Sequence, residues 1–230
     1  KRAKIFSRLG REISVAVKEG GPDTETNIRL RSAVGSAKSL NMPKENIERA
    51  IKKGEGNDPD SNYEEVRYEG YGPDGVAIIV EALTNNKNRT AAEVRSTFSK
   101  YGGNLGETGS VSFGFKRLGS ITLKKNDIDE EELFDFIVEN GSEDYELNED
   151  EYNIYCDQTI LHQLNQKIIE RFGPTNFTGL IWKSENEISV SKEKAETLFK
   201  LLNILEENED VQVVSSNFDV SDDILNTLRL

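Results

Sequence analysis

The sequence predicts an α+β protein with three domains: an N-terminal three-helix bundle and two small α/β (ferredoxin-like) domains, one inserted in the other. The first observation is a helical spacing of apolar residues in three short segments before residue 54. The second is a strand, a helix and two further strands between residues 76 and 123, which is most of a ferredoxin-like unit. The third is a sharp change to acidic composition after residue 124.

The predicted bundle contains three helices. The first covers residues 1–18, the second is capped by Asp23 or Thr24, and the third has Pro43 in its first turn and ends at Gly54. The expected buried residues are Ile5, Phe6, Leu9, Ile13, Ala16 and Val17, then Leu30, Ala33 or Val34, Ala37 and Leu40, then Ile47, Ala50 and Ile51. Residues 54–62 are rich in turn-forming residues, which predicts a linker and a first domain over residues 1–62.

The central domain is predicted around the apolar run 76–80. Residues 76–83 have the pattern of a strand with both faces partly buried, and the asparagines that follow can cap a helix over residues 90–101. That helix ends at the glycine pair 102–103. Alternation of Val111, Phe113 and Phe115 predicts a second strand, which a tight turn at residues 118–119 connects to a third strand over residues 121–123.

Residues 125–183 are predicted to form an acidic α+β domain inserted in the central one. Its expected elements are a helix over 127–140, strands over 145–147 and 152–156, a helix over 159–172 and a strand near 178–183. A helix over 192–207 and a strand over 211–215 then complete a central domain of residues 63–124 plus 184–230, which ends in a loose acidic tail. A linear succession of three domains is the alternative.

The composition excludes several classes of protein. Of the 230 residues, 35% are hydrophobic and 31% are charged, which favours several small cores over one large one. A single cysteine rules out an intramolecular disulfide framework and suits a reducing compartment. No apolar run approaches the roughly 20 residues that span a bilayer, so we expect a soluble protein with no membrane partner.

Charge is divided unevenly along the chain, although the net charge is −13. Residues 1–53 carry thirteen Lys and Arg against six Asp and Glu, whereas residues 127–157 carry fourteen acids and no base. A segregated basic face suggests a polyanionic partner, although a solvated helix face is the structural alternative. The predicted nucleic-acid-binding residues are Lys1, Lys4, Arg8, Arg11, Lys18, Arg29, Arg31, Lys38, Lys52 and Lys53. Aromatic residues are sparse there, so we expect backbone contacts with little sequence preference.

Two loops that flank the central helix form a second candidate surface. Both contain more Gly and Asn than a simple connection needs, and glycines let a main chain approach a partner closely. The possible contact residues are Asn86, Asn88, Arg89, Thr90, Gly102, Gly103, Asn104 and Gly106. Tight turns in a small α/β domain explain the same composition equally well.

Patterns that would indicate an enzyme or a metal site fail on context. Residues 70–75 match G-x-G-x-x-G, but the glycines precede a strand and open no helix, so we interpret them as a turn. His162 and Cys156 are too few for a structural zinc site, and we expect Cys156 to pack in a core and His162 to be partly exposed. The acids near residue 150 lack the glycine and the spacing of a calcium loop. We therefore expect no catalytic residues, no metal and no cofactor.

The run EGYGPDGVAIIVEALTNNKNRTAAEVRSTFSKYGGNLGETGSVSF (residues 69–113) resembles the central signature of the YebC/PmpR family. KIFSRLGREISVAVKEGG, NMPKENIERAIKKGEG and LFKLLNILEENEDVQVV (residues 4–21, 41–56 and 198–214) extend the resemblance over nearly the whole chain. The family includes relatives of the mitochondrial translational activator of cytochrome oxidase. The resemblance implies three domains, no catalytic activity, a cytoplasmic location and a role in gene expression. Family members carry a further basic, Trp-containing segment before the position of Lys1.

Two functions therefore lead the interpretation. The first is a non-enzymatic, DNA-binding transcriptional regulator that uses the N-terminal helices. The second is a ribosome-associated translation factor or translational activator that binds RNA, with the acidic domain away from phosphate or against basic ribosomal protein. An enzyme acting on a small molecule is a third class, for which the sequence offers no coherent set of residues.

Overall fold

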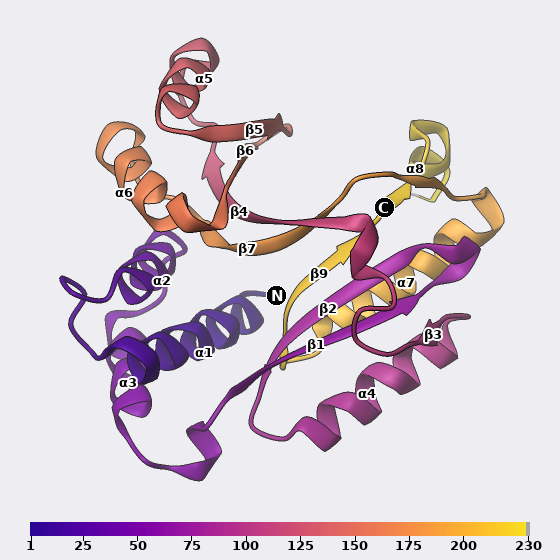
Figure 1. The fold of residues 1–230 in the computed structure, drawn as a ribbon, viewed down its shortest axis with the longest axis horizontal. Helices are drawn as coiled ribbons and strands as arrows, with labels where there is room; N and C mark the ends of the chain where they lie inside the picture. Colours follow the sequence, from indigo (N-terminus) through magenta and orange to yellow (C-terminus); the bar gives the residue numbers. More distant parts are fainter. Residues whose placement is uncertain (229–230) are drawn as a thin grey trace. The chain divides into compact units, whose positions relative to one another are not determined.

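The computed structural model describes residues 1–228, which form two compact units (Figure 1). Unit 1 contains residues 1–61 and 117–181, and unit 2 contains residues 62–116 and 182–230. The chain therefore passes between the units three times. Both units combine helices with small sheets, which confirms the predicted α+β class.

The N-terminal part of unit 1 is a bundle of three helices, as predicted: α1 (Arg2–Gly20), α2 (Ile28–Ser39) and α3 (Lys44–Glu55). Its core contains most of the expected apolar residues, namely Ile13, Ala16, Val17, Leu30, Ala33, Val34, Ala37, Ile47 and Ala50, together with Met42. Ile5 was expected in this core, but it is exposed. Burial of these side chains is what stabilises helices this short, because isolated helices of about 12 residues are marginal in water.

The second helix is capped by Asn27, and the prediction of Asp23 or Thr24 was wrong. The Asn27 side chain accepts a hydrogen bond from the Leu30 amide (3.0 Å) and donates to the carbonyl oxygens of Ala16 (2.7 Å) and Gly21 (2.8 Å). One buried amide group therefore caps α2 and joins it to the end of α1, which an aspartate could not do because it has no donor.

The remainder of unit 1 is a β-α-β-β-α-β domain. Its elements are β4 (Phe115–Lys124), α5 (Glu130–Glu139), β5 (Ser142–Leu147), β6 (Glu151–Cys156), the 3₁₀ turn Gln158–Ile160, α6 (Leu161–Phe172) and β7 (Phe177–Ser184). The strand order β5-β6-β4-β7 is that of a ferredoxin-like sheet. Its core, formed by both helices and the sheet, includes Ile121, Leu133, Ile137, Ile154 and Ile168.

The predicted boundary inside the first strand of this domain was misplaced. Residues 118–119 were expected to turn, but they continue through β4, which pairs with β6 from Gly119 to Lys124. A Cβ on Gly119 would lie 2.9 Å from Cys156 Sγ and 2.9 Å from Leu161 Cδ1, so the glycine serves close packing and not a turn. We propose that residues 117–124 belong with the inserted domain. The three domains are then the bundle (1–61), the inserted domain (117–181) and the central domain (62–116 plus 182–230).

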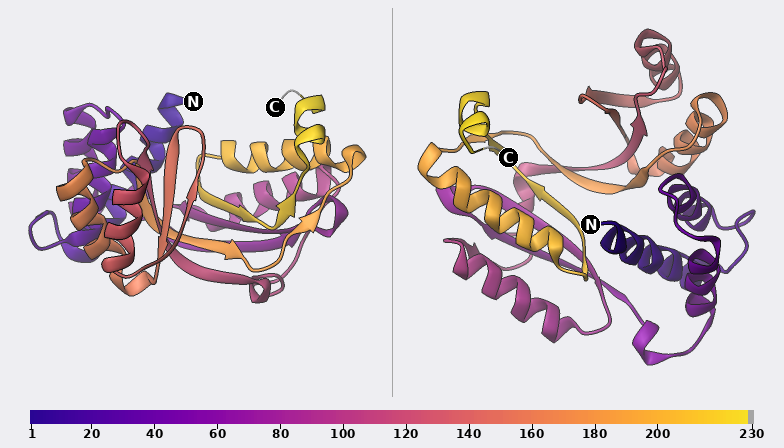
Figure 2. Two further views of the ribbon diagram at one scale, coloured as in Figure 1. Left: turned by 90° about the horizontal axis from the view of Figure 1, so that it is seen from above. Right: turned by 180° about the vertical axis from the view of Figure 1, so that it is seen from behind.

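Unit 2 is built on the four-stranded sheet β3-β1-β2-β9. Its strands are β1 (Glu64–Tyr71), β2 (Ala77–Thr84), β3 (Asn104–Leu105) and β9 (Val211–Ser216), and its long helices are α4 (Lys87–Lys100) and α7 (Lys192–Glu207). Both helices cover the same face of the sheet (Figure 2, right), where Val94 and Phe98 of α4 and Leu198 and Leu201 of α7 meet Ile78. On the opposite face, Ala77, Ile79, Val111, Phe115 and Trp182 form a smaller core.

The order of strands in unit 2 differs from the predicted one in two respects. Strand β1, which pairs with β2 along its whole length, was not predicted, because residues 70–75 were interpreted only as a turn. The predicted strand through Val111, Phe113 and Phe115 was wrong: Ser112–Gly114 is a 3₁₀ turn, and Phe113 is 79% exposed whereas Val111 and Phe115 are buried. Alternation of burial over three residues occurs in such a turn as well as in a strand.

The turns and the C-terminal elements complete the fold. Two further 3₁₀ turns are Pro59–Ser61 and Pro73–Gly75. The second lies between β1 and β2. The interpretation of residues 70–75 as a turn before a strand is therefore correct for Gly72 and Gly75. Instead of a loose tail, β10 (Phe218–Asp219) pairs with β8 (Ile188–Ser189), and α8 (Asp222–Leu228) packs on the core through Ile224 and Leu228.

Candidate nucleic-acid interface

Three of the predicted lysines lie at one end of the helical bundle. The C-terminal halves of α1 and α3 touch there: Ser14 Oγ donates to the Ala50 carbonyl oxygen (2.8 Å), and a Cβ on Gly54 would lie 2.5 Å from the Ser14 carbonyl oxygen. Lys18 follows the α1 side of this contact, and Lys52 and Lys53 precede Gly54 on the α3 side. All three lysines are exposed.

Arg49 extends this surface, and the sequence interpretation omitted it. It is exposed on α3 and lies three and four residues before Lys52 and Lys53, which places it on the same helix face. The i, i+3, i+4 spacing of the three cations was visible in the sequence and could have identified it. We define Lys18, Arg49, Lys52 and Lys53 as the basic end of the bundle.

The other predicted cations of the first helix lie nearer its N-terminus. Lys1 is exposed, whereas Lys4, Arg8 and Arg11 are partly buried. Lys4 Nζ and Arg8 Nε are themselves buried, so these two predicted cations do not present their charge at the surface in this structure. These four residues run along α1 and away from its contact with Gly54.

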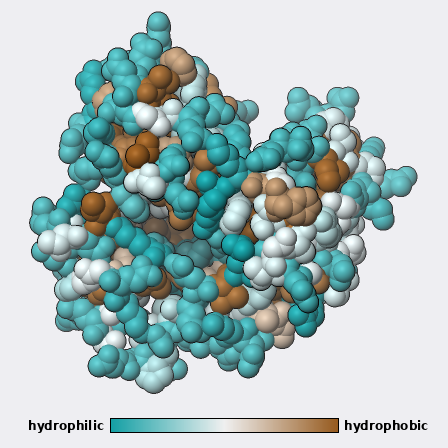
Figure 3. Space-filling model, viewed as in Figure 1, coloured by the Kyte–Doolittle hydropathy of each residue, from teal (hydrophilic) through white to brown (hydrophobic). Residues whose placement is uncertain are grey.

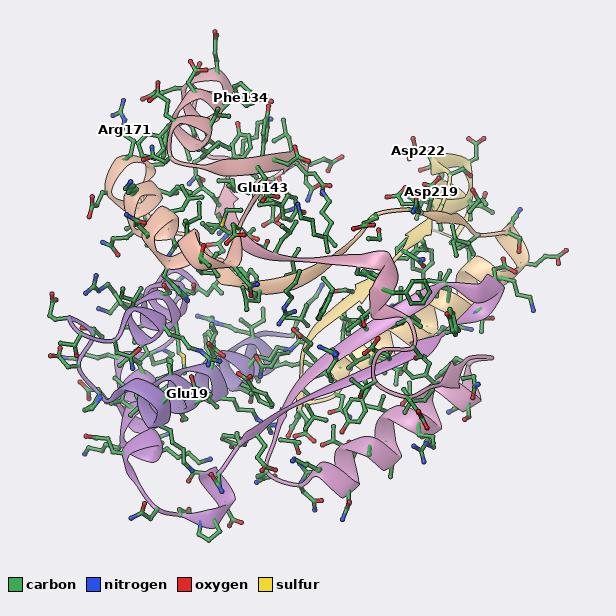
Figure 4. All side chains as sticks on the ribbon, in the orientation of Figure 1. Glu19, Phe134, Glu143, Arg171, Asp219 and Asp222 are labelled. Carbon is green, nitrogen blue, oxygen red and sulfur yellow. The ribbon has the colours of Figure 1, made fainter. Side chains whose placement is uncertain are left out.

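Arg29 has partners within the bundle. Its Nε and Nη2 lie 2.8 and 3.1 Å from the two carboxylate oxygens of Glu12, and its Nη1 lies 2.6 Å from Glu19 Oε2. Figure 4 labels Glu19 near the end of α1. A guanidinium held by two carboxylates joins α2 to α1 and carries no net positive charge to the surface.

Of the other two predicted cations of α2, Arg31 is bonded within the bundle and Lys38 is exposed. Arg31 donates to the main-chain oxygens of Thr24 (2.8 Å) and Glu25 (2.7 Å), so it fixes the loop that precedes α2. Lys38 is exposed in the last turn of α2, where a cation interacts favourably with the helix dipole. The exposed cations of the bundle are therefore mainly lysines, which bind phosphate as point charges with little directional preference.

The predicted loop before α4 is partly a structural cluster. Thr90 is fully buried, and its hydroxyl lies 2.7 Å from both Asp210 Oδ2 and Thr84 Oγ1; the prediction of Thr90 as a contact residue is inconsistent with this burial. Arg89 Nη2 lies 3.0 and 2.9 Å from the Asp210 carboxylate oxygens, which raises the pKa of Arg89. Asn86 caps α4 by accepting from the Arg89 amide (3.0 Å), and Asn88 is exposed.

The glycine-rich loop after α4 is organised by a buried carboxylate that the sequence analysis missed. Glu69 is 0% exposed and accepts hydrogen bonds from the amides of Gly109 (2.6 Å), Val111 (3.2 Å) and Ser112 (2.7 Å). Burial raises the pKa of Glu69, but these hydrogen bonds outweigh burial and hold the pKa below its usual range. Arg67 Nε also donates to Glu69 (3.1 Å).

The four predicted positions of this loop have different roles. Gly102 has φ 74°, which ends α4, and a Cβ on Gly103 would lie 2.6 Å from the Tyr71 carbonyl oxygen. The Gly106 amide donates to the Glu69 carbonyl oxygen (2.8 Å), whereas Asn104 is exposed in β3. The glycines are thus explained by backbone packing, and Asn88 and Asn104 are the exposed polar side chains of this second surface.

The two residues considered for nucleophilic chemistry lie in packed surroundings. Burial, assisted by Asp157 and Glu143, raises the pKa of the Cys156 thiol to about 11, so the thiol is protonated and unreactive at neutral pH. His162 Nδ1 lies 2.8 Å from Ser32 Oγ, where α6 meets α2, and burial lowers the pKa of this imidazole. Among residues 1–228, no three His, Cys, Asp or Glu side chains are grouped to hold a metal ion.

Comparison with known proteins agrees with this architecture. The sequence model for the TACO1/YebC protein N-terminal domain matches residues 1–57, and the one for the TACO1/YebC second and third domain, labelled Transcrip_reg, matches residues 63–218. The chain belongs to the TACO1/YebC family. A crystal structure of a conserved hypothetical protein from Aquifex aeolicus, Aq1575, is 45% identical, with a TM-score of 0.91 over 97% of this chain and 93% of that one.

Membership of the TACO1/YebC family places the basic end of the bundle in the family's N-terminal domain and Glu69 and its loop in the second matched region. The family is of a regulatory type. Within residues 1–228, no helix has the length and apolar character needed to cross a membrane.

Proposed function

We propose that this TACO1/YebC family member is a non-enzymatic regulator of gene expression that binds nucleic acid through phosphate contacts made by its N-terminal bundle. The contact surface is the basic end of the bundle, Lys18, Arg49, Lys52 and Lys53, extended by Lys38 on α2 and by Lys1 and Arg11 along α1. Arg29 joins α2 to α1, and Arg31 fixes the loop that precedes α2. The observation that carries the proposal is the exposure of Lys18 on α1 and of Arg49, Lys52 and Lys53 on α3, two helices that touch at Ser14 and Gly54.

The chemistry of this surface favours backbone contact over base reading. Lysine ammonium groups attract phosphate without the bidentate geometry that identifies guanine, and the bundle presents few aromatic side chains for stacking on bases. Binding of this kind is strong at low salt and weakens steeply as salt rises, because it is driven by release of counterions. The regulator therefore needs a further source of target selection, such as nucleic-acid shape or a protein partner.

Duplex DNA is the first target that we propose, in keeping with the transcription-regulator label of the matched family region. Ribosomal RNA is the second candidate, and one observation favours it. Fourteen acids without a base between residues 127 and 157 repel a long duplex, whereas a folded RNA with protein neighbours offers surfaces of both signs. Both targets use the same basic end of the bundle.

Two measurements made side by side separate these targets. Tagged protein is sedimented through a gradient of cell lysate at low and at raised salt, and the purified protein is titrated with labelled duplex DNA. Duplex binding that weakens as salt rises, without ribosome co-migration, supports the DNA function. Co-migration with ribosomes without a duplex shift supports the RNA function, and absence of both contradicts nucleic-acid binding.

A further inference from the structure

Helix α5 and the adjacent strand β5 carry a patch of exposed apolar side chains within the most acidic part of the chain. Phe134 is 43% exposed and Val138, one turn later on the same helix face, is 52% exposed. The Phe134 ring lies 5.6 Å from the ring of Tyr145 on β5, so the patch continues from the helix onto the strand. Leu147, two residues after Tyr145 and therefore on the same face of β5, is 39% exposed.

The patch is distinct from the core on which α5 packs. Leu133 and Ile137 occupy the buried face of the helix, and Phe136 packs against Phe172 with the two ring centroids 5.2 Å apart. Phe134 and Val138 are therefore not needed to attach α5 to its sheet. Figure 4 shows Phe134 on α5, and Figure 3 shows apolar residues among hydrophilic ones over this helix. Several exposed apolar side chains that adjoin one another indicate a binding surface more strongly than scattered ones do.

Carboxylates surround this patch, and helix stability explains only some of them. Glu130, Glu131 and Glu132 lie in the first turn of α5, where negative charge interacts favourably with the helix dipole. Asp135 and Glu139 lie further along α5, and Glu139 is in the last turn, where an acid is unfavourable and no basic residue is present. Carboxylates retained at these positions, beside Phe134 and Val138, fit a function in binding.

We propose that the surface formed by Phe134, Val138, Tyr145 and Leu147, with its rim of carboxylates, binds a basic amphipathic protein segment. Apolar side chains of that segment would cover the rings and the valine, and its lysines and arginines would face the rim. Charge complementarity selects this occupant: residues 127–157 contain fourteen acids and no base, so an acidic segment or a nucleic acid would be repelled. This partner site is separate from the proposed nucleic-acid surface, and the test of one does not depend on the result for the other.

The test uses the full chain and a labelled model helix composed of leucine and lysine. Wild-type protein binds the peptide in a saturable one-to-one complex, measured by fluorescence anisotropy. Phe134→Gln combined with Val138→Gln weakens that binding by roughly tenfold or more, the effect expected from losing one buried aromatic and one aliphatic contact. Both positions are exposed, so the far-UV circular dichroism and the thermal midpoint of the variant stay close to those of wild type.

Two controls make the result specific. Ile204→Gln changes a side chain on α7 that is 39% exposed, and it leaves peptide affinity unchanged. Glu131→Gln with Asp135→Gln lowers the affinity more than Glu187→Gln with Glu193→Gln, a pair of equal charge in unit 2. Equal affinity of wild type and the Phe134/Val138 variant overturns the proposal. An equal loss of peptide affinity in both acidic double variants overturns the proposal as well, because the binding would then depend only on the net charge of the protein. Loss of oligonucleotide binding in the Phe134/Val138 variant would assign the patch to nucleic acid and overturn it too.

Discussion

Single residues with close surroundings fix the local geometry of both units. Gly54 lets α3 touch α1, Asn27 bonds two helices at once, and Glu69 gathers three loop amides. Each is a small or polar residue in a position where a larger or apolar one would disrupt the local contacts. The effect of replacing each one is therefore calculable from the atoms around it.

Gly54→Ala should destabilise the bundle by about 1–3 kcal/mol, because the added methyl would lie 2.5 Å from the Ser14 carbonyl oxygen and 2.7 Å from Val17 Cβ. Chemical denaturation followed by circular dichroism measures the change. Gly35→Ala on α2 is the matched control: its Cβ meets nothing within 4 Å, so the higher helix propensity of alanine should stabilise by up to about 1 kcal/mol. Equal effects of the two substitutions would contradict the close α1–α3 contact.

Glu69→Gln should destabilise unit 2 by about 1–3 kcal/mol, because the new amide group presents a donor to main-chain donors that need an acceptor. Amide hydrogen exchange at Gly109 and Ser112 should accelerate in this variant, whereas Glu107→Gln, at an exposed position, should leave it unchanged. Because the pKa of Glu69 is lowered in the folded protein, its contribution is complete above about pH 4.5 and is lost as pH falls further. Unaltered exchange at both amides would be inconsistent with this role.

In unit 1, helix α2 of the bundle contacts helix α6 of the inserted domain and the loop that follows it. Polar groups dominate it: Ser32 Oγ lies 2.8 Å from His162 Nδ1, and Ser39 Oγ lies 2.7 Å from Asn176 Oδ1. Asn165 is buried between them, and its Oδ1 accepts from Thr175 Oγ1 (2.7 Å). The bundle therefore packs on the inserted domain through hydrogen bonds, and one of them, between Ser32 and His162, depends on the protonation of the imidazole.

The stability of unit 1 should fall as pH drops below about 6.5, the usual pKa of histidine. Burial lowers the pKa of His162 in the folded protein, so the unfolded chain binds more protons between the two pKa values, and acid favours unfolding in that window. Denaturation midpoints measured from pH 5 to pH 7 test this expectation. His162→Gln should flatten the dependence in that range and leave the acid transition below about pH 4.5, which belongs to carboxylates such as Glu69, in place. A slope that persists in the variant would exclude His162 as its source.

The sequence predicted the positions of helices better than the pairing of strands. Helical spacing located α1, α3 and α7 within two residues, because an amphipathic stripe reports directly on which face is buried. It missed β1, which contains four charged residues and Gly70, and it misplaced the start of β4, whose Gly119 suggested a turn. Strand pairing depends on residues distant in the sequence, so local pattern could not show that residues 117–124 pair with β6.

For the candidate site too, the sequence indicated which helices carry the cations but not the partners of individual residues. The local excess of bases pointed to the bundle, and helical spacing correctly predicted that Lys18, Lys52 and Lys53 are exposed. It omitted the exposed Arg49 and did not show that Lys4 and Arg8 are partly buried. Spacing could not show that Arg29 is held by Glu12 and Glu19 or that Thr90 is buried against Asp210, because these partners come from other elements. Glu69 gave no signal in the sequence, where it is one acid among many.

At the scale of the whole molecule, the account depends on a division of charge along the chain. Residues 1–53 carry an excess of bases, and residues 127–157 carry only acids among their charged residues. The proposed roles follow this division: the basic end of the bundle contacts phosphate, and the acidic α5–β5 surface binds a basic segment of protein. A chain with a net charge of −13 can bind a polyanion only if its cations are gathered in one place.

The salt dependence of nucleic-acid affinity in a lysine variant tests this central claim most directly. Lys18→Gln, Lys52→Gln and Lys53→Gln, combined, are compared with Lys192→Gln, Lys194→Gln and Lys200→Gln, which remove the same charge from α7 in unit 2. The affinity of labelled duplex DNA and of ribosomal RNA is measured from 50 to 200 mM salt. The account predicts weaker binding in the bundle variant, with the salt slope reduced by about 0.9 for each duplex phosphate contact removed, and little change in the α7 variant. Equal affinities and equal slopes for the two variants would contradict it.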